Sequence, residues 1–436
     1  MYLKTIKILI ATVLVTVSFP LSAQKVTFSP YSRYGIGDIY QPVMGHNVAM
    51  GGVGIARCTS LYLNSLNPAG NAELPIQRFI FDVGMDTKYT NVSSATASQK
   101  NNNTTFKYLT GAFAAKPWWN YTFSMRPYSS VGYSMKDTTI LQNQSDGAYY
   151  GYFQDYSGSG GLSNMALTTS FTFLKMFSLG VKASYLWGSL DRYNNSRIIS
   201  SSSYAAESDY TNRYILHGFS YEFGAMVSKS IISSKDSTKT VAKINAGFTY
   251  GTDSKINSRN ELLFLRKILL NNIQYNDTIC NDTLTKGHIT IPGKMGVGVS
   301  VELYNRFTIA ADYTHQDWTS FDIEGENHTT LQESTFLGAG VEFVYDKYST
   351  RFFRTIHYRA GFHTEDTYLQ LNGTPIKNQG ITFGVGMPLR SSMILNVACD
   401  MGYRGTTDNN LYKEKYFLMH FNVTIHDVWF VKRKFQ

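Results

Sequence analysis

The stretch YFLMHFNVTIHDVWF, from Tyr416 to Phe430, alternates apolar and mixed side chains along its whole length. One parity holds Phe417, Met419, Phe421, Val423 and Ile425, and the other holds Leu418, His420, Asn422, Thr424 and His426. Because successive side chains of a strand point to opposite faces, the pattern predicts a strand with one apolar face. Soluble strands usually hold about five or six residues, so this length favours a strand that crosses a bilayer.

The same period recurs along the chain. We expect fourteen strands, at roughly residues 78–88, 105–115, 121–136, 162–174, 177–193, 212–231, 240–258, 288–303, 306–322, 334–345, 355–369, 379–388, 393–405 and 413–431. An even number of strands closes an antiparallel barrel. In lipid, only a closed barrel gives every backbone N–H and C=O group of its strands a hydrogen-bond partner. The fold class is therefore all-β, a transmembrane antiparallel β-barrel of about 14 strands.

A soluble antiparallel sandwich also alternates. Segment length disfavours it, as do Trp187, Trp318 and Trp429 at segment ends, which are typical of an aromatic girdle. Two stretches are expected as long external loops. The Ser-rich residues 194–211 form one, and residues 259–287 form the other, either with a short helix or with an extra pair of strands.

The N-terminus predicts export. Lys4 and Lys7 precede an apolar run and the small-residue exit Leu21-Ser22-Ala23, which together indicate a signal peptide over residues 1–23. A membrane anchor would need about 20 apolar residues, more than this run holds. Cleavage near Ala23 would send a barrel to the outer membrane of a Gram-negative cell. The remaining chain divides into an N-terminal hatch or plug over residues 24–76 and the barrel over residues 77–436.

The charge and the cysteine content restrict which partners, metals and cofactors are expected. The net charge of +9 is dispersed, and export argues against nucleic acid and for contact with the lipid of the outer membrane. The cysteines, Cys58, Cys280 and Cys399, form no disulfide framework and no CxxC metal spacing, so neither a metal nor a cofactor is expected. A bridge between Cys58 and Cys280 stays open.

About fifty residues lie between the expected cleavage site and the first strand, and they include the stretch AMGGVGIARCTSLYLNSLNPAGNAEL from Ala49 to Leu74. Gly51, Gly52 and Gly54 allow tight backbone packing, and Asn67-Pro68 is a turn signal. Since a barrel of fourteen strands leaves an aqueous lumen unless something fills it, we expect this stretch to be a plug. A disordered tail is the alternative, and it would leave apolar side chains in water.

Three sets of residues resemble a known family. They are AMGGVGIA from Ala49 to Ala56, the element Asn67-Pro68-Ala69, and IPGKMGVGVSVELYNRFTIAADYTHQDW with Pro292, Gly296, Asp312, Tyr313 and Trp318. They resemble the FadL/TodX-type outer-membrane transport proteins, fourteen-stranded barrels with an N-terminal hatch that carry long-chain fatty acids or other hydrophobic compounds. The penultimate position of Phe435 departs from barrels that end on a terminal aromatic residue.

The resemblance implies a route for cargo. Gly51, Gly52, Gly54, Asn67, Pro68 and Ala69 would gate a passive channel for hydrophobic small molecules, which would leave sideways through a kink in the third strand. Here that segment reads YTFSMRPYSSVGYSM, and we place the kink at Pro127 and Gly132, because a proline removes a ladder donor. Alternatively, Pro127 merely begins a strand after a loop.

The lumen face holds candidate polar residues: Asp312, His357, Arg359, His363, Asp400 and His420. Their spacing assembles no nucleophile with a base and an orienting acid, so we expect no enzyme. The glycine repeats GIGD, GVGV, GAGV and GVGM open no helix and do not indicate phosphate binding. The alternative function is a protein-binding accessory or carrier subunit of an outer-membrane secretion or assembly machine, with other outer-membrane or periplasmic proteins as partners.

Overall fold

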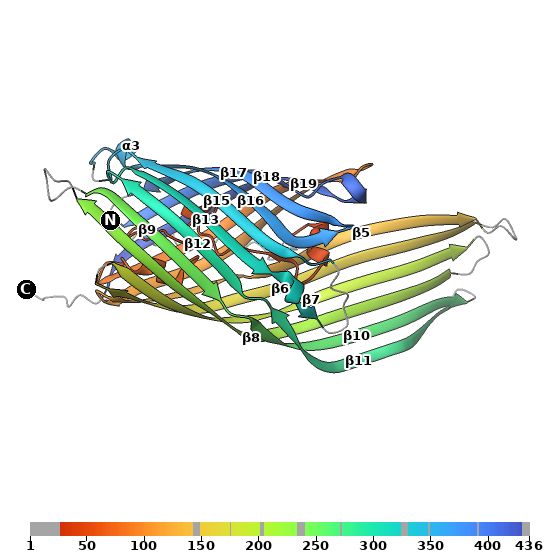
Figure 1. The fold of residues 1–436 in the computed structure, drawn as a ribbon. Coiled ribbons are helices and arrows are strands. Elements are labelled where there is room, and N and C mark those ends of the chain that lie inside the picture. Colours follow the sequence, from red (N-terminus) through yellow and green to blue (C-terminus); the bar gives the residue numbers. More distant parts are fainter. Residues whose placement is uncertain are drawn as a thin grey trace, which may run out of the picture.

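The computed structural model describes residues 27–142, 149–174, 176–200, 205–232, 240–270, 273–323, 330–347, 349–389 and 392–429 (Figure 1). The expected signal peptide and the C-terminal residues around Phe435 lie outside these ranges. No helix within the described ranges is long and apolar enough to cross a bilayer.

The chain begins with short elements and continues with long strands. The N-terminal elements are the 3-10 helix η1 (Pro30–Arg33), β1 (Asp38–Ile39), α2 (Gly45–Val48) and the 3-10 helix η2 (Pro68–Asn71). The strands that follow are β2 (Arg78–Ser93), β3 (Ser98–Lys116), β4 (Trp119–Pro127), β5 (Ser129–Gln142), β6 (Tyr149–Phe173), β7 (Phe177–Ser200), β8 (Ala205–Ile232), β9 (Thr240–Gly251), β10 (Ser254–Leu270), β11 (Ile273–Ile291), β12 (Lys294–Leu303), β13 (Phe307–Asp317), β14 (Asp322–Ile323), β15 (Glu333–Val344), β16 (His357–Leu371), β17 (Thr374–Pro388), β18 (Met393–Arg404) and β19 (Lys413–Val428). Short helical turns η3 (Trp318–Ser320), α3 (Phe352–Thr355) and η4 (Asp408–Asn410) lie in the connections.

Antiparallel neighbours form a closed barrel. The last strand, β19, pairs with β2 from Lys413↔Ser93 to Val428↔Arg78 and thereby closes the wall. Within the described residues the wall holds fourteen strands when β4 and β5 count as one bent strand and both the β10–β11 hairpin and the two-residue β14 are set apart. Closure leaves no sheet edge in the wall at this seam, as a spanning barrel requires. The expected fold class is confirmed.

Both expected external loops are strands for most of their length. Residues 194–200 continue β7, residues 205–211 begin β8, and the two pair up to Ile199↔Ala205. The helix expected within residues 259–287 is wrong and the extra pair of strands is right: β10 pairs with β11 and with β8. Partner strands on both sides of β10 satisfy its backbone, and this pairing outweighs the helix-like spacing of its leucines. The strands project beyond the barrel at the end opposite to α3 (Figure 1).

Alternation separates an outer from an inner face. On β13, Ile309 and Tyr313 are exposed, whereas Ala310, Asp312 and Thr314 between and beside them are buried. An outward apolar band with a polar interior is the pattern of a spanning barrel. The parity of the sequence therefore identifies which side chains face the lumen.

One expected girdle residue lies inside. Trp318 is buried in η3 and packs on Phe321 and Tyr368, with ring centroids 5.5 and 4.8 Å away. These rings belong to a large apolar cluster that also takes in Tyr31 and Ile36 of the N-terminal elements. The cluster reaches the base of the β10–β11 hairpin, so apolar side chains fill that end of the lumen.

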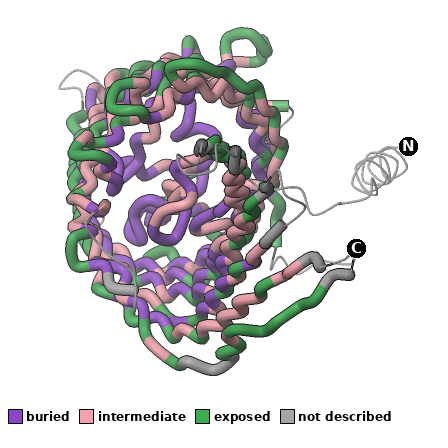
Figure 2. Tube along the Cα trace, turned by 90° about the vertical axis from the view of Figure 1, so that its right-hand side faces the viewer, coloured by how far each residue is buried: buried purple, intermediate pink, exposed green. Residues whose placement is uncertain are grey.

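The N-terminal segment, residues 27–76, packs inside the barrel. Figure 2 shows buried chain within the ring of strands. Ile36, Met50, Val53 and Leu63 have no exposed surface, and neither has Asn67. A disordered tail would have left these side chains in water, and the structure instead surrounds them with the wall.

Candidate functional site

A glycine turn seats the N-terminal segment on the wall. Gly51 follows α2 with φ +70°, and its N–H donates to Thr382 Oγ1 at 2.8 Å. A Cβ built on Gly51 would lie 2.4 Å from the carbonyl oxygen of Phe362, so backbone meets backbone here. Gly361 on β16 faces the same contact, since its Cβ would lie 2.3 Å from the Gly51 nitrogen. Only glycine fits either side of so close an approach.

Asp312 holds the next turn of the segment. The backbone N–H groups of Gly54 and Ile55 both donate to Asp312 Oδ2, at 2.6 and 2.8 Å. Asp312 stands on β13 and is 3% exposed. Two successive N–H groups that converge on one oxygen form a concave anion site, which the carboxylate occupies. Asp312 thus acts as an anchor for the segment.

The Asn67-Pro68-Ala69 element packs against a second part of the wall. Asn67 begins η2, where its Oδ1 accepts the N–H of Ala69 at 2.9 Å and its Nδ2 donates to the carbonyl of Ile55 at 2.8 Å. A Cβ on Gly180 of β7 would lie 2.3 Å from the Pro68 carbonyl carbon, and one on Gly224 of β8 would lie 2.2 Å from Asn67 Oδ1. The glycines make room for the turn that the asparagine shapes.

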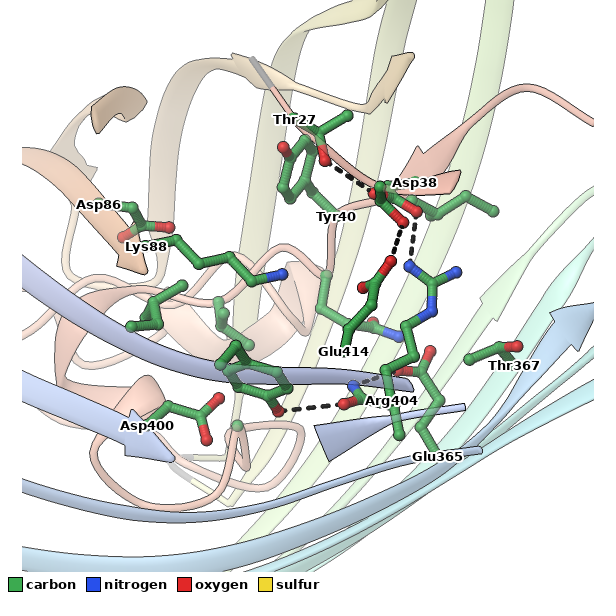
Figure 3. Close-up of a pocket in the computed structure, with 18 of the residues that line it drawn as sticks. Thr27, Asp38, Tyr40, Asp86, Lys88, Glu365, Thr367, Asp400, Arg404 and Glu414 are labelled. Carbon is green, nitrogen blue, oxygen red and sulfur yellow. Dashed lines mark hydrogen bonds and ion pairs between the residues drawn. The ribbon is translucent and has the colours of Figure 1, made fainter. Parts of the chain in front are cut away.

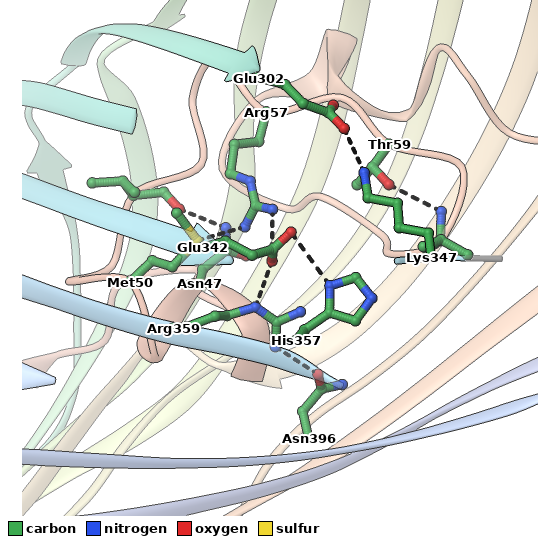
Figure 4. A network of polar contacts seen from close by, with 12 residues as sticks. Asn47, Met50, Arg57, Thr59, Glu302, Glu342, Lys347, His357, Arg359 and Asn396 are labelled. Atoms are coloured by element: carbon green, nitrogen blue, oxygen red, sulfur yellow. Dashed lines mark hydrogen bonds and ion pairs between the residues drawn. The ribbon is translucent and has the colours of Figure 1, made fainter. Parts of the chain in front are cut away.

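A buried ion network joins the segment to the wall (Figure 4). Glu342 on β15 accepts from Arg57 Nη2 at 3.1 Å and from Arg359 Nε at 2.6 Å. His357 Nδ1 lies 3.4 Å from the other oxygen of Glu342, and Arg359 Nη1 donates to Asn396 Oδ1 at 2.9 Å. The side chains of the two arginines and the glutamate are 7%, 0% and 5% exposed. Since a buried charge must be paired, these residues depend on one another.

Two further carboxylates face the lumen from β2. Asp86 contacts His420 and forms an ion pair with Lys107 at 3.1 Å. Asp82 accepts from Asn422 Nδ2 at 3.0 Å and is fully buried. The contacts with His420 and Asn422 cross the seam between β19 and β2, so they join the two ends of the barrel sequence.

A cavity of about 260 Å³ lies between the N-terminal segment and the wall (Figure 3). Its charged lining includes an ion pair between Arg404 Nη1 and Asp38 Oδ1 at 2.6 Å, and Lys88, whose Nζ lies 4.9 Å from the centre of the Tyr416 ring. Its apolar lining comprises Phe28, Ile39, Val43, Val48, Trp318, Phe336 and Leu418. The cavity therefore offers both an apolar wall and fixed charges.

The third strand is bent beside this cavity. Pro127 is the last residue of β4, Tyr128 interrupts the ladder, and β5 begins at Ser129. The ladder between β3 and the third strand ends at Leu109↔Met125, while β5 pairs with β6 and with β1 of the N-terminal segment. Gly132 on β5 faces this segment, since a Cβ there would lie 2.0 Å from the carbonyl oxygen of Thr27. Pro127 is thus inside a bent strand, and it does not begin a strand after a loop.

The structure divides the six expected lumen residues among separate contacts. His357 and Arg359 meet at Glu342, and His363 Nε2 lies 3.1 Å from Asp400 Oδ2. His420 contacts Asp86 across the seam, and Asp312 binds backbone. All six lie on the lumen side, but no contact brings them together as one site. Within the described part of the chain, no group of three or more His, Cys, Asp or Glu side chains is arranged to hold a metal ion.

Sequence reasoning missed the partners of these residues. Glu342, Asp82 and Asp86 carry buried charges on strands whose lumen parity the alternation identifies. A charged residue on the inner parity was an available signal for all three. Arg57 lies in the N-terminal segment, where no periodicity marks which side chains are buried.

The described cysteines are free thiols. Cys58 is buried in the N-terminal segment, and Cys280 is partly exposed on β11, which projects from the opposite end of the barrel. A bridge between them is therefore wrong. Burial raises the pKa of the Cys58 thiol to about 12, which keeps it protonated and unreactive.

Comparison with known proteins shows both the family and the fold. A family model described as BamG matches residues 5–436. None of the curated proteins matches this sequence. Among solved structures, the toluene transporter TodX of P. putida has 14% identity and a TM-score of 0.57, with 91% of this chain and 100% of that chain covered. A Pseudomonas aeruginosa FadL homologue has 11% identity and a TM-score of 0.57 over 90% and 100% of the two chains.

A third solved structure, described as the CymD monoaromatic hydrocarbon channel, has 10% identity and a TM-score of 0.54 over 88% of this chain and 97% of that chain. Identities this low show a shared fold, and they confirm the FadL/TodX-type architecture that the sequence resembles. The family model covers nearly the whole sequence, including both the N-terminal segment and the barrel. The chain therefore belongs to the BamG family and has the barrel fold of the FadL/TodX-type channels.

Proposed function

We propose that this protein is an outer-membrane channel for the passive uptake of small hydrophobic molecules. The bend after Pro127 carries the proposal, because the third strand leaves β3 at Leu109↔Met125 beside a cavity that the N-terminal segment helps to form. Apolar cargo gains free energy when it leaves water for lipid, so a passage through the wall needs no energy source. The N-terminal segment would serve as the hatch.

The cavity supports a small amphipathic cargo. Its volume of about 260 Å³ lies near the lower end of known ligand pockets. Phe336, Val43 and Leu418 offer an apolar surface, while Lys88 offers a cation. A short fatty-acid-like molecule, with an apolar body and a carboxylate, matches this combination.

Replacing Pro127 by valine should straighten the third strand and slow uptake. Valine restores a backbone N–H and favours extended pairing, so the wall would close beside the cavity. We expect uptake of a fluorescent fatty acid into cells to fall by about tenfold, which corresponds to about 1.4 kcal/mol. Pro388→Val is the matched control, since Pro388 ends β17 away from the bend. Unchanged uptake in a folded Pro127→Val barrel would move the exit elsewhere.

The second candidate is a protein-binding accessory subunit of an outer-membrane secretion or assembly machine. It is favoured by the strands from β5 to β8 and the β10–β11 hairpin, which extend past the barrel as a single sheet (Figure 1). Buried ion pairs also fix the N-terminal segment in the lumen, as a permanent seal would require. The matching family model bears the description BamG, which names no transported compound.

Mass spectrometry of the gently extracted protein should separate the two candidates. For the channel we expect an apolar small molecule to co-purify, and Pro127→Val to change its amount. A stoichiometric protein partner without such a molecule would support the accessory subunit and count against the channel. The experiment needs native membranes, because extraction from an overproducing host would dilute any partner.

A further inference from the structure

An aromatic and basic cluster lies at the end of the barrel opposite to the β10–β11 hairpin. It comprises Tyr304 and Arg306 of the β12–β13 turn, and Tyr345, Phe352, Phe353 and Arg354 between β15 and β16; we term these six residues the rim cluster. Figure 1 places α3, which contributes three of them, at this end. None of the six takes part in the contacts of the N-terminal segment described above.

Two guanidinium groups converge on one ring. The Cζ atoms of Arg306 and Arg354 lie 5.6 and 4.9 Å from the centre of the Tyr345 ring. Backbone bonds fix both turns beside it: the N–H of Val344 donates to the Arg306 carbonyl at 2.8 Å, and that of Asp346 donates to the Arg354 carbonyl at 2.9 Å. The two cations are therefore held on adjacent connections by one aromatic platform.

The guanidinium groups keep their charges available. Both arginines are exposed, and no ion pair joins either of them to a carboxylate of the described residues. Glu302, the acid on the neighbouring strand, pairs with Lys347 instead. The same connection between β15 and β16 also holds one acid, Asp346, and a third arginine, Arg351. Paired planar guanidinium groups suit the oxygens of a phosphate, which they bind in a bidentate manner.

The cluster continues the lipid-facing band. Ile309 and Phe307 point outward along β13, and Phe307 packs on Phe343 with ring centroids 4.7 Å apart. Immediately beyond this pair, Phe353 is 78% exposed and meets Phe352 edge to face at 5.6 Å. Aromatic residues beside basic ones are typical of the boundary between hydrocarbon and head groups.

We infer that the rim cluster binds the phosphate head group of an anionic phospholipid in the leaflet at the end of the barrel opposite to the β10–β11 hairpin. Arg306 and Arg354 hold the phosphodiester, and Phe353 inserts beside the acyl chains. Continuity with the lipid-facing band selects a lipid over a free phosphate, since a soluble anion gains nothing from exposed phenylalanines. The site is independent of whether the lumen transports cargo.

Native mass spectrometry of the full-length protein tests the site. The protein is titrated in detergent with dioleoyl phosphatidylglycerol, with dioleoyl phosphatidylcholine and with inorganic phosphate. We expect phosphatidylglycerol to bind, and the Arg306→Ala/Arg354→Ala variant to bind it about tenfold more weakly, as the loss of charge-assisted hydrogen bonds predicts. Phe353→Ser should also weaken lipid binding.

Arg213→Ala/Arg266→Ala is the matched control, because it removes two exposed arginines from strands β8 and β10 at the other end of the molecule. Heat-modifiable migration in gels confirms that each variant is folded, and Arg354→Ala alone replaces the double variant should the latter not assemble. Equal loss in the control and in the rim variant would overturn the site. So would equal binding of phosphatidylcholine, or binding of inorganic phosphate with no preference for phosphatidylglycerol.

Discussion

Replacing residues 47–72 by a glycine-serine linker of the same length should turn the closed barrel into an open pore. This stretch contributes the Gly51 turn, the two N–H groups held by Asp312, and the Asn67 turn, and most of its side chains are buried against the wall. A linker of equal length spans the same ends but has no apolar side chains to pack. Because a barrel of fourteen strands encloses an aqueous lumen when unfilled, water and small solutes would pass.

Electrical conductance across planar bilayers measures this change. We expect the natural protein to be closed and the linker variant to show steady openings, with small-solute flux at least about tenfold higher. Heat-modifiable migration in gels shows whether the variant barrel has assembled. A linker in place of residues 94–97, which form the largely exposed β2–β3 turn, controls for the insertion itself. An assembled variant that leaks no more than this control would mean that other residues seal the lumen.

Much of the barrel could be predicted because lipid imposes a simple rule on each strand. Outward residues must be apolar whatever the neighbouring strand is, so the alternation of Ile309 to Tyr313 is visible without knowledge of any partner. The bend of the third strand was visible for a similar reason, since Pro127 lacks an N–H wherever it lies. Such local constraints hold before the barrel closes.

The rule that outward residues are apolar does not apply to segments outside the bilayer. The Ser-rich residues 194–200 and 205–211 and the leucine-rich second half of β10 have two faces toward water or protein, so their composition does not reveal strands. Their pairing becomes apparent only once β7 and β8 lie side by side. Trp318 was misplaced for the opposite reason, because a tryptophan at a strand end suits a girdle as well as an apolar cluster.

The contacts within the lumen depend on closure, which a sequence does not display. Asp86 and His420 are 334 residues apart, and they meet because β19 pairs with β2 in one particular register. Glu342 meets Arg57 only because the N-terminal segment folds back into the barrel. Parity predicted which strand residues face inward, but their partners follow from register and from the path of the segment.

Replacing Glu342 by leucine should loosen the N-terminal segment more than any other single change that we foresee. The substitution leaves Arg57 and Arg359 buried without their shared carboxylate, and removing one partner of a buried pair costs about 3–5 kcal/mol. Glu342→Gln should cost less, since the amide oxygen still accepts a hydrogen bond. Denaturant unfolding in micelles measures the stability, and tryptic cleavage at Arg57 reports release of the segment.

Glu302→Leu is the matched control, because Glu302 pairs with Lys347 in a more exposed position, with side chains 21% and 23% exposed, and an ion pair near the surface contributes about 0–1 kcal/mol. A further variant tests the cause. Arg57→Met/Glu342→Leu/Arg359→Met removes all three charges together, and an apolar trio of similar volume is often as stable as the ions it replaces. We expect it to recover stability and protection of the segment relative to Glu342→Leu. Were the triple variant as unstable as the single one, lost packing at Glu342, and not the stranded charge of the two arginines, would account for the loosening.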